Sequence, residues 1–147
     1  MSAALDDAGF MVALLDIVIP PNGDVPGAGG LGLSPAVAEG LRGDPLLGPM
    51  VGPALESLRT ATLAESGEGL AGMQPDGRLA LVQEHASANP VLMMGLLRHL
   101  CPAYYALPQV LSAIGEEPRP PFPLGYEVEE TDAGLLAILR KRATAPD

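Results

Sequence analysis

The stretch Asn89–Cys101, which reads NPVLMMGLLRHLC, decides the fold. Asn89 followed by Pro90 predicts a helix start, because asparagine caps a first turn and proline fits the first helical position. Beyond this start, apolar residues lie on all sides of the expected helix, and a helix of that kind is buried. We therefore expect a central helix against which the rest of the chain packs.

Helical signals continue on both sides of this stretch. We expect further helical segments over residues 5–19, 53–65, 74–88 and 108–114, and a shorter piece over residues 102–106 that holds Tyr104 and Tyr105. Ser34-Pro35 repeats the cap-and-proline start, and Gly43 lies past the end of the short helix that it opens. Pro20 ends the first helix, and the sequence between it and Ser34 is predicted to be a loop rich in proline and glycine.

Prolines also limit the helix that we expect over residues 53–65. Pro49 and Pro53 each lack an N–H and clash with the preceding turn, so we expect them to prevent one long helix from residue 46 onward. In the helix that follows, Leu79, Val82 and Ala86 share a stripe that is predicted to face the core.

The last part of the chain has a different pattern. Residues 116–130, EEPRPPFPLGYEVEE, predict an extended proline-rich arm, after which Thr131 or Asp132 caps a terminal helix through Arg140. No stretch alternates with period two, so no sheet is expected. The prediction is an all-α single domain of about six short helices, with a helical part at 1–115 and the arm and terminal helix at 116–147 as part of the same unit.

Composition supports a folded chain and excludes several functions. The 147 residues carry a net charge of -10 and are 48% apolar, with a mean hydropathy of +0.26. The 18 glycines and 16 prolines approach the level of disordered chains, but the apolar content favours a packed core. Nucleic-acid binding is not expected, because Lys141 is the only lysine and Arg140–Arg142 is the only basic cluster. The single Cys101 excludes an internal disulfide and, with two histidines, does not supply a usual zinc ligand set.

No membrane insertion is expected. The best apolar run, Phe10–Ile19, contains Asp16 and is shorter than the roughly 20 residues that a transmembrane helix needs. The N-terminal region carries Asp6 and Asp7 instead of the basic residues of a signal peptide. We therefore expect a cytoplasmic protein, or a periplasmic one if it is exported together with a partner.

Two patterns suggest chemistry. Gly27, Gly29 and Gly32 spell G-x-G-x-x-G, but Pro26 precedes them and no β-α-β unit follows. We interpret this pattern as a close-packed or partner-facing turn rather than a dinucleotide site. His99 is expected to be an interior or interface histidine, and a catalytic role would require an orienting partner.

The second pattern is the spacing of Cys101, two residues after His99. It invites a thiol-nucleophile interpretation, but the leucine-rich surroundings favour an inert buried thiol. His85 lies beside Glu84 and is expected to be solvated. We assign no catalytic, metal-binding or cofactor-binding residue in this chain.

Candidate partner-binding residues are chosen by side-chain chemistry. Methionine adapts to irregular surfaces, and tyrosine is enriched at interfaces, although core packing remains the alternative for both. The candidate interface consists of Met93, Met94, His99, Tyr104, Tyr105, Phe122 and Tyr126. The acidic surface is either simply solvated or complementary to a basic partner surface.

Four segments resemble the gluconate 2-dehydrogenase subunit 3 family, the small subunits of flavin-dependent dehydrogenases. They are LLDIVIPPNGDVPGAGGLG at 14–32, GPALESLRTATLAESGEGLAGM at 52–73, MQPDGRLALVQEHA at 73–86 and YYALPQVLSAIG at 104–115. Family members often begin with a twin-arginine export signal, and this sequence departs from that pattern.

The resemblance implies an all-helical, non-catalytic accessory subunit in a hetero-oligomer. The partner would be a large subunit of the glucose–methanol–choline (GMC) oxidoreductase type, which holds FAD and oxidises a sugar, a sugar acid or a related alcohol. The small subunit would assist its assembly or stability. Two alternatives stay open: a stand-alone helical enzyme that uses His99, and a protein-interaction module with a different partner.

Overall fold

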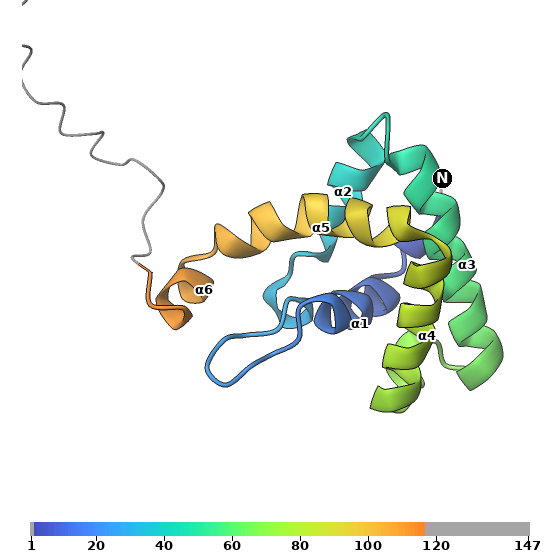
Figure 1. Ribbon diagram of the computed structural model, residues 1–147, viewed down its shortest axis with the longest axis horizontal. Coiled ribbons are helices and arrows are strands. Elements are labelled where there is room, and N and C mark those ends of the chain that lie inside the picture. The colour runs from blue at the N-terminus through green and yellow to red at the C-terminus, as the bar shows by residue number, and fades with distance from the viewer. Residues whose placement is uncertain (1, 117–147) are drawn as a thin grey trace, which may run out of the picture.

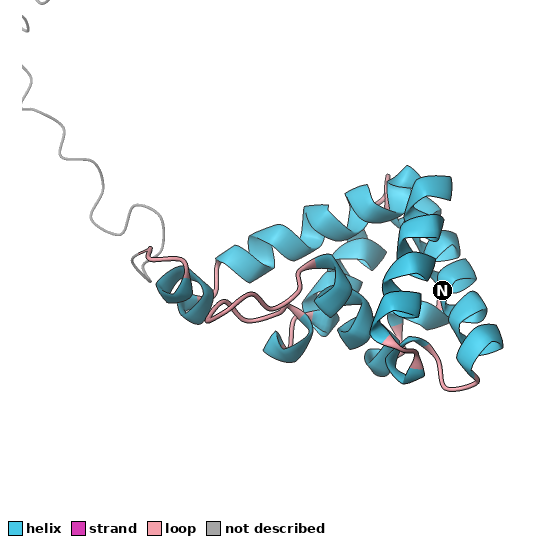
Figure 2. Ribbon diagram, turned by 60° about the horizontal axis from the view of Figure 1, so that its bottom comes forward, coloured by secondary structure: helices cyan, strands magenta, loops and turns pink. Residues whose placement is uncertain are grey.

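The structure, a computed structural model, describes residues 2–116 and is built from helices, with no strand in that range (Figures 1 and 2). Its α-helices are α1 (Ala8–Val18), α2 (Ser34–Gly43), α3 (Gly48–Ser66), α4 (Pro75–Ala88), α5 (Pro90–Tyr105) and α6 (Pro108–Ala113). Three short 3-10 turns are η1 (Ala3–Leu5), η2 (Gly29–Leu31) and η3 (Leu70–Gly72). The predicted all-α single domain is confirmed. The predicted arm and terminal helix lie outside the described residues.

Helix α5 connects most of the molecule, as predicted for the central helix. It runs along one side of the fold and packs against α2, α3, α4 and α6, while α1 lies against α2, η2 and η3 (Figure 1). Its buried side chains recur every four residues at Leu92, Leu96, Leu100 and Tyr104. The opposite side of α5 is open to solvent, so the expectation of burial on all sides is wrong for that face.

Helix α1 is anchored at its start by Asp7. The carboxylate of Asp7 accepts a 3.0 Å hydrogen bond from the N–H of Phe10 and a second, also 3.0 Å, from Nε of Arg59 on α3. The bond from Phe10 is the main reason that the pKa of Asp7 lies below its ordinary value, with Arg59 adding to the effect. One side chain therefore caps α1 and fastens it to α3.

Helix α3 is longer than predicted, because Pro53 lies inside it. Pro49 occupies the first turn, where its missing N–H costs nothing. Pro53 lies opposite the buried stripe of α3, so the carbonyl that loses its helical donor is on the open side. The stripe itself is continuous and holds the helix together across the proline: Val51, Ala54, Leu55, Leu58 and Thr62.

The same correction applies to α5, which continues through Pro102 to Tyr105 instead of ending near Cys101. Pro102 is exposed, and the turn that contains it is fixed by Leu100 and Tyr104 in the core. In both helices, packing of the apolar face outweighs the loss of one backbone hydrogen bond.

Two smaller predictions also fail. Leu79 is exposed, because α4 turns Val82 and the half-buried Leu81 toward the core. Ser34 is the first residue of α2 and not its cap. Helix α5 begins at Pro90 directly after Asn89, as predicted, although the side chain of Asn89 makes no capping bond. Buried side chains elsewhere position these two helices, so their starts do not depend on the predicted caps.

Candidate partner-binding site

His99 lies on the inner side of α5 and faces the corner between α2 and α3. Its Nε2 is 3.3 Å from Oδ2 of Asp44, and its side chain is 20% exposed. On the other side of the ring, the backbone of Gly40 is so close that a Cβ there would lie 2.6 Å from Nδ1. Both nitrogens therefore face other parts of the chain. The geometry is that of a clamp between α5 and the corner, and it leaves no ring nitrogen directed at a substrate.

Asp44 is the partner that sequence analysis did not identify. Its Oδ1 accepts hydrogen bonds of 2.9 Å from the N–H groups of Leu46 and Leu47, so it turns the chain into α3. These bonds, that of Leu47 above all, hold the pKa of Asp44 below its ordinary value, and His99 and the charge of Arg98 act in the same direction. The Asp44-Pro45 sequence is a turn signal that could have suggested this role.

Cys101 and His99 do not form a catalytic pair. Residues two apart on a helix point about 200° apart around its axis. Accordingly, His99 faces Asp44 and Gly40, whereas Cys101 is a free, half-buried thiol on the outer side of α5. The thiol-nucleophile interpretation therefore lacks its base.

The two tyrosines at the end of α5 have opposite environments. Tyr104 is buried, and its hydroxyl donates a 2.6 Å hydrogen bond to the carbonyl of Pro26 in the loop after α1. Burial raises the pKa of Tyr104 above its ordinary value. Tyr105 is 51% exposed and meets Tyr104 edge-on, with 5.1 Å between ring centroids. Tyr104 thus belongs to the core, and only Tyr105 offers its ring to another molecule.

The outer face of α5 carries a row of apolar side chains. Met94 is 52% exposed, Leu97 is 37% exposed, and Met93 is half-buried at the edge. We define the α5 stripe as Met94, Leu97, Arg98, Cys101 and Tyr105, which the helical period places on one side. The stripe is held outward because Gly95, on the inner side of α5, packs directly against Val51 of α3.

The α5 stripe carries no unpaired charge. Its only charged side chain, Arg98, places Nε 3.3 Å from Oδ2 of Asp44, so the cation is paired. Leu46, which is 72% exposed, lies two residues from Asp44 at the α2–α3 corner. Such a surface differs from the acidic character of the chain as a whole. Phe122 and Tyr126, the remaining interface candidates, lie outside the described residues.

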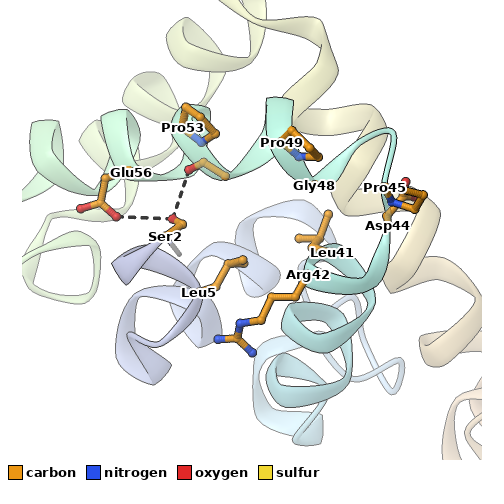
Figure 3. Close-up of a pocket in the computed structure, with 11 residues that line it drawn as sticks. Ser2, Leu5, Leu41, Arg42, Asp44, Pro45, Gly48, Pro49, Pro53 and Glu56 are labelled. Atoms are coloured by element: carbon orange, nitrogen blue, oxygen red, sulfur yellow. Dashed lines mark hydrogen bonds between the residues drawn. The ribbon is translucent and has the colours of Figure 1, made fainter.

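A groove of about 710 Å³ lies on the other side of the same corner (Figure 3). Its walls are the N-terminal segment, the end of α2 and a face of α3 where Gly48, Pro49, Gly52 and Pro53 leave little side-chain bulk. The groove was not predicted from the sequence, although the recurrence of glycine and proline at a spacing of four could have suggested it.

The polar groups of the groove are bonded within the chain. Ser2 donates a 3.1 Å hydrogen bond to the carbonyl of Gly52 (Figure 3). Glu56 accepts one of 2.8 Å from the N–H of Ala4. Arg42 forms an ion pair with Asp6. These bonds tie the N-terminal segment to α3 and leave the groove without a side chain poised for catalysis.

The glycine-rich loop after α1 is a close-packed turn, as predicted. The N–H of Gly29 donates a 2.8 Å hydrogen bond to Oδ1 of Asp16. A Cβ at Gly27 would lie 2.5 Å from that same oxygen. The glycines therefore let the loop approach α1, and the pattern is not that of a phosphate-binding loop.

Further features limit the chemistry of the described part. Among residues 2–116 there is no group of three or more His, Cys, Asp or Glu side chains that could hold a metal ion. Within the same range, no helix is both long and apolar enough to cross a bilayer. Comparison with models of known protein families, with curated proteins and with solved structures gave no match.

Proposed function

We propose that this chain is a non-catalytic accessory subunit that binds a larger protein through the α5 stripe. The observation that carries the proposal is the stripe itself, in which Met94, Leu97 and Tyr105 are exposed on a chain of net charge -10. Exposed Met94 and Tyr105 are the types of side chain that protein interfaces favour.

The chemistry of the site favours binding over catalysis. His99 uses Nε2 to bind Asp44, and Gly40 covers Nδ1, so a stand-alone enzyme based on His99 has no free base. The groove offers Arg42 and Glu56, but each already bonds another group of the chain.

We assign the partner by the sequence resemblance. It would be a large FAD-dependent dehydrogenase of the GMC type, which would oxidise a sugar or an alcohol while this chain stabilises it. The fold brings two of the resembling segments together, because Tyr104 of the last segment donates its hydrogen bond to Pro26 of the first. These two segments are therefore in contact in the folded chain.

Capture from the native source tests the proposal. The tagged chain should retain a large yellow flavoprotein, and Met94→Asp combined with Leu97→Asp should abolish retention, since charge in an apolar contact is costly. Leu79→Asp is the matched control, because Leu79 is 45% exposed on α4, outside the stripe. Retention of a different protein, lost in the same double variant, would favour the alternative of an interaction module with another partner.

A further inference from the structure

We propose that the C-terminal segment of residues 135–142 occupies the α5 stripe when no partner is bound. The proposal concerns the face used in the proposed function, on which it rests, and adds how that face is covered in the free chain. A partner would then have to displace the segment, so apolar residues of the partner would replace those of the segment on the α5 stripe.

The stripe offers what such a segment needs. Met94, Leu97 and Tyr105 are exposed, and Cys101 between them is half-buried. From Met94 to Tyr105 the stripe is roughly 16 Å long, at about 1.5 Å per residue. That length matches a segment of two to three helical turns.

The sequence after residue 116 supplies a complementary segment. Residues 133–139 read AGLLAIL and carry no charge, and Arg140, Lys141 and Arg142 follow directly. The helical part to be covered is acidic and contains no lysine. Its four arginines already bond other groups of the chain: Arg42, Arg59, Arg78 and Arg98. The apolar segment therefore matches the apolar side chains of the stripe, and the three basic residues that follow it match the negative net charge of the domain as a whole.

The tether is long enough to allow the contact. The described chain ends at Glu116, just after α6, and α6 packs against α5. Eighteen residues separate Glu116 from Leu135, and a chain of that length can span up to about 60 Å, several times the length of the stripe. Because the segment is tethered to the same chain, its effective concentration at the stripe is high, and a small contact area is enough to hold it. A second copy of the chain would have to bury a larger area to form a stable dimer.

Cys101 provides the test, because the only cysteine of the chain lies in the stripe. The rate at which N-ethylmaleimide modifies Cys101 is measured by mass spectrometry in the full chain, without any partner. The variant Leu136→Asp/Leu139→Asp places two charges in the segment. The matched control, Leu124→Asp/Val128→Asp, places two charges in the tether. Circular dichroism verifies that each variant keeps its helices.

We expect Cys101 of the segment variant to react several-fold faster than that of the wild type, and the tether variant to react at the wild-type rate. Equal rates in all three proteins would overturn the proposal. A rate that rises on dilution to the same extent in all three would instead identify a second copy as the occupant and would also overturn it. The capture experiment is independent of this one, so a missing flavoprotein partner and an uncovered stripe give different results.

Discussion

Replacing Tyr104 by phenylalanine removes one oxygen atom from the junction between α5 and the loop after α1. The hydroxyl of Tyr104 donates a 2.6 Å hydrogen bond to the carbonyl of Pro26, and the ring is 1% exposed. Without the hydroxyl, that carbonyl loses its donor, which costs about 1–3 kcal/mol when the acceptor is buried. Pro26 is half-buried, so water can replace part of the bond, and the lower half of that range applies.

We therefore expect Tyr104→Phe to lower the free energy of unfolding by about 1–2 kcal/mol. For a chain of this size, that loss lowers Tm by roughly 4–8 °C. Urea unfolding followed by circular dichroism measures the effect, and an unchanged m-value would show that the variant unfolds from the same native state.

Tyr105→Phe is the matched control, since it makes the same chemical change in the neighbouring residue. Tyr105 is 51% exposed and keeps its edge-on ring contact after the change, so its variant should be as stable as the wild type. Equal stability of the two variants would refute the placement of Tyr104 in the core.

The stability of the wild type should also depend on pH through Tyr104, because burial raises the pKa of this side chain in the folded state. The contribution of Tyr104 to the free energy of unfolding is complete below the ordinary tyrosine pKa and is lost as pH rises through the higher folded value.

Three further predictions concern contacts that fasten the helices to one another. Asp7→Ala removes the cap of α1 and should lower the free energy of unfolding in urea by about 1 kcal/mol. Because the pKa of Asp7 is lowered in the folded state, the wild type should lose this extra stability as pH falls from the ordinary aspartate pKa through the lower folded value. A stability difference between wild type and variant that stays constant across that range would contradict the assignment. Gly95→Leu drives a side chain into Val51 and should destabilise the fold by about 1–3 kcal/mol, whereas Gly43→Leu, where nothing lies near the added Cβ, should cost less in the same denaturant titration. His99→Leu should lower Tm by more than His85→Leu does, because His99 joins α5 to Asp44 at the α2–α3 corner, while His85 bonds only Leu81 of its own helix. Equal shifts in a thermal melt would contradict the role of His99 as a clamp.

The sequence predicted the helical class and most helix positions, because prolines and apolar spacing act locally. It misplaced the ends of α3 and α5, where Pro53 and Pro102 lie on exposed sides of helices that are held by buried stripes. A proline effect depends on which side of the helix faces the core, and that is decided by residues far away in the chain. Packing between distant parts of the chain therefore decided where α3 begins and where α5 ends, and local sequence signals could not predict these positions.

The candidate site was predicted only in part, for a similar reason. Met94 and Tyr105 are exposed as an interface requires, but Tyr104, of the same type as Tyr105 and adjacent to it, is buried. Composition identifies which side chains suit an interface, and the helical phase decides which of them reach the surface. Asp44, 55 residues from His99, was not predicted as its partner because their contact depends on how α5 crosses the α2–α3 corner.

The most direct test of the central claim is the flavin content of what the chain captures. The tagged wild type and the Met94→Asp/Leu97→Asp variant are passed through extract from the native source, and the flavin absorbance and the mass of the retained protein are measured. We expect the wild type to retain a large flavoprotein in an amount close to its own, and the variant to retain none. Capture of no flavoprotein by the folded wild type, or equal capture by both, would contradict it.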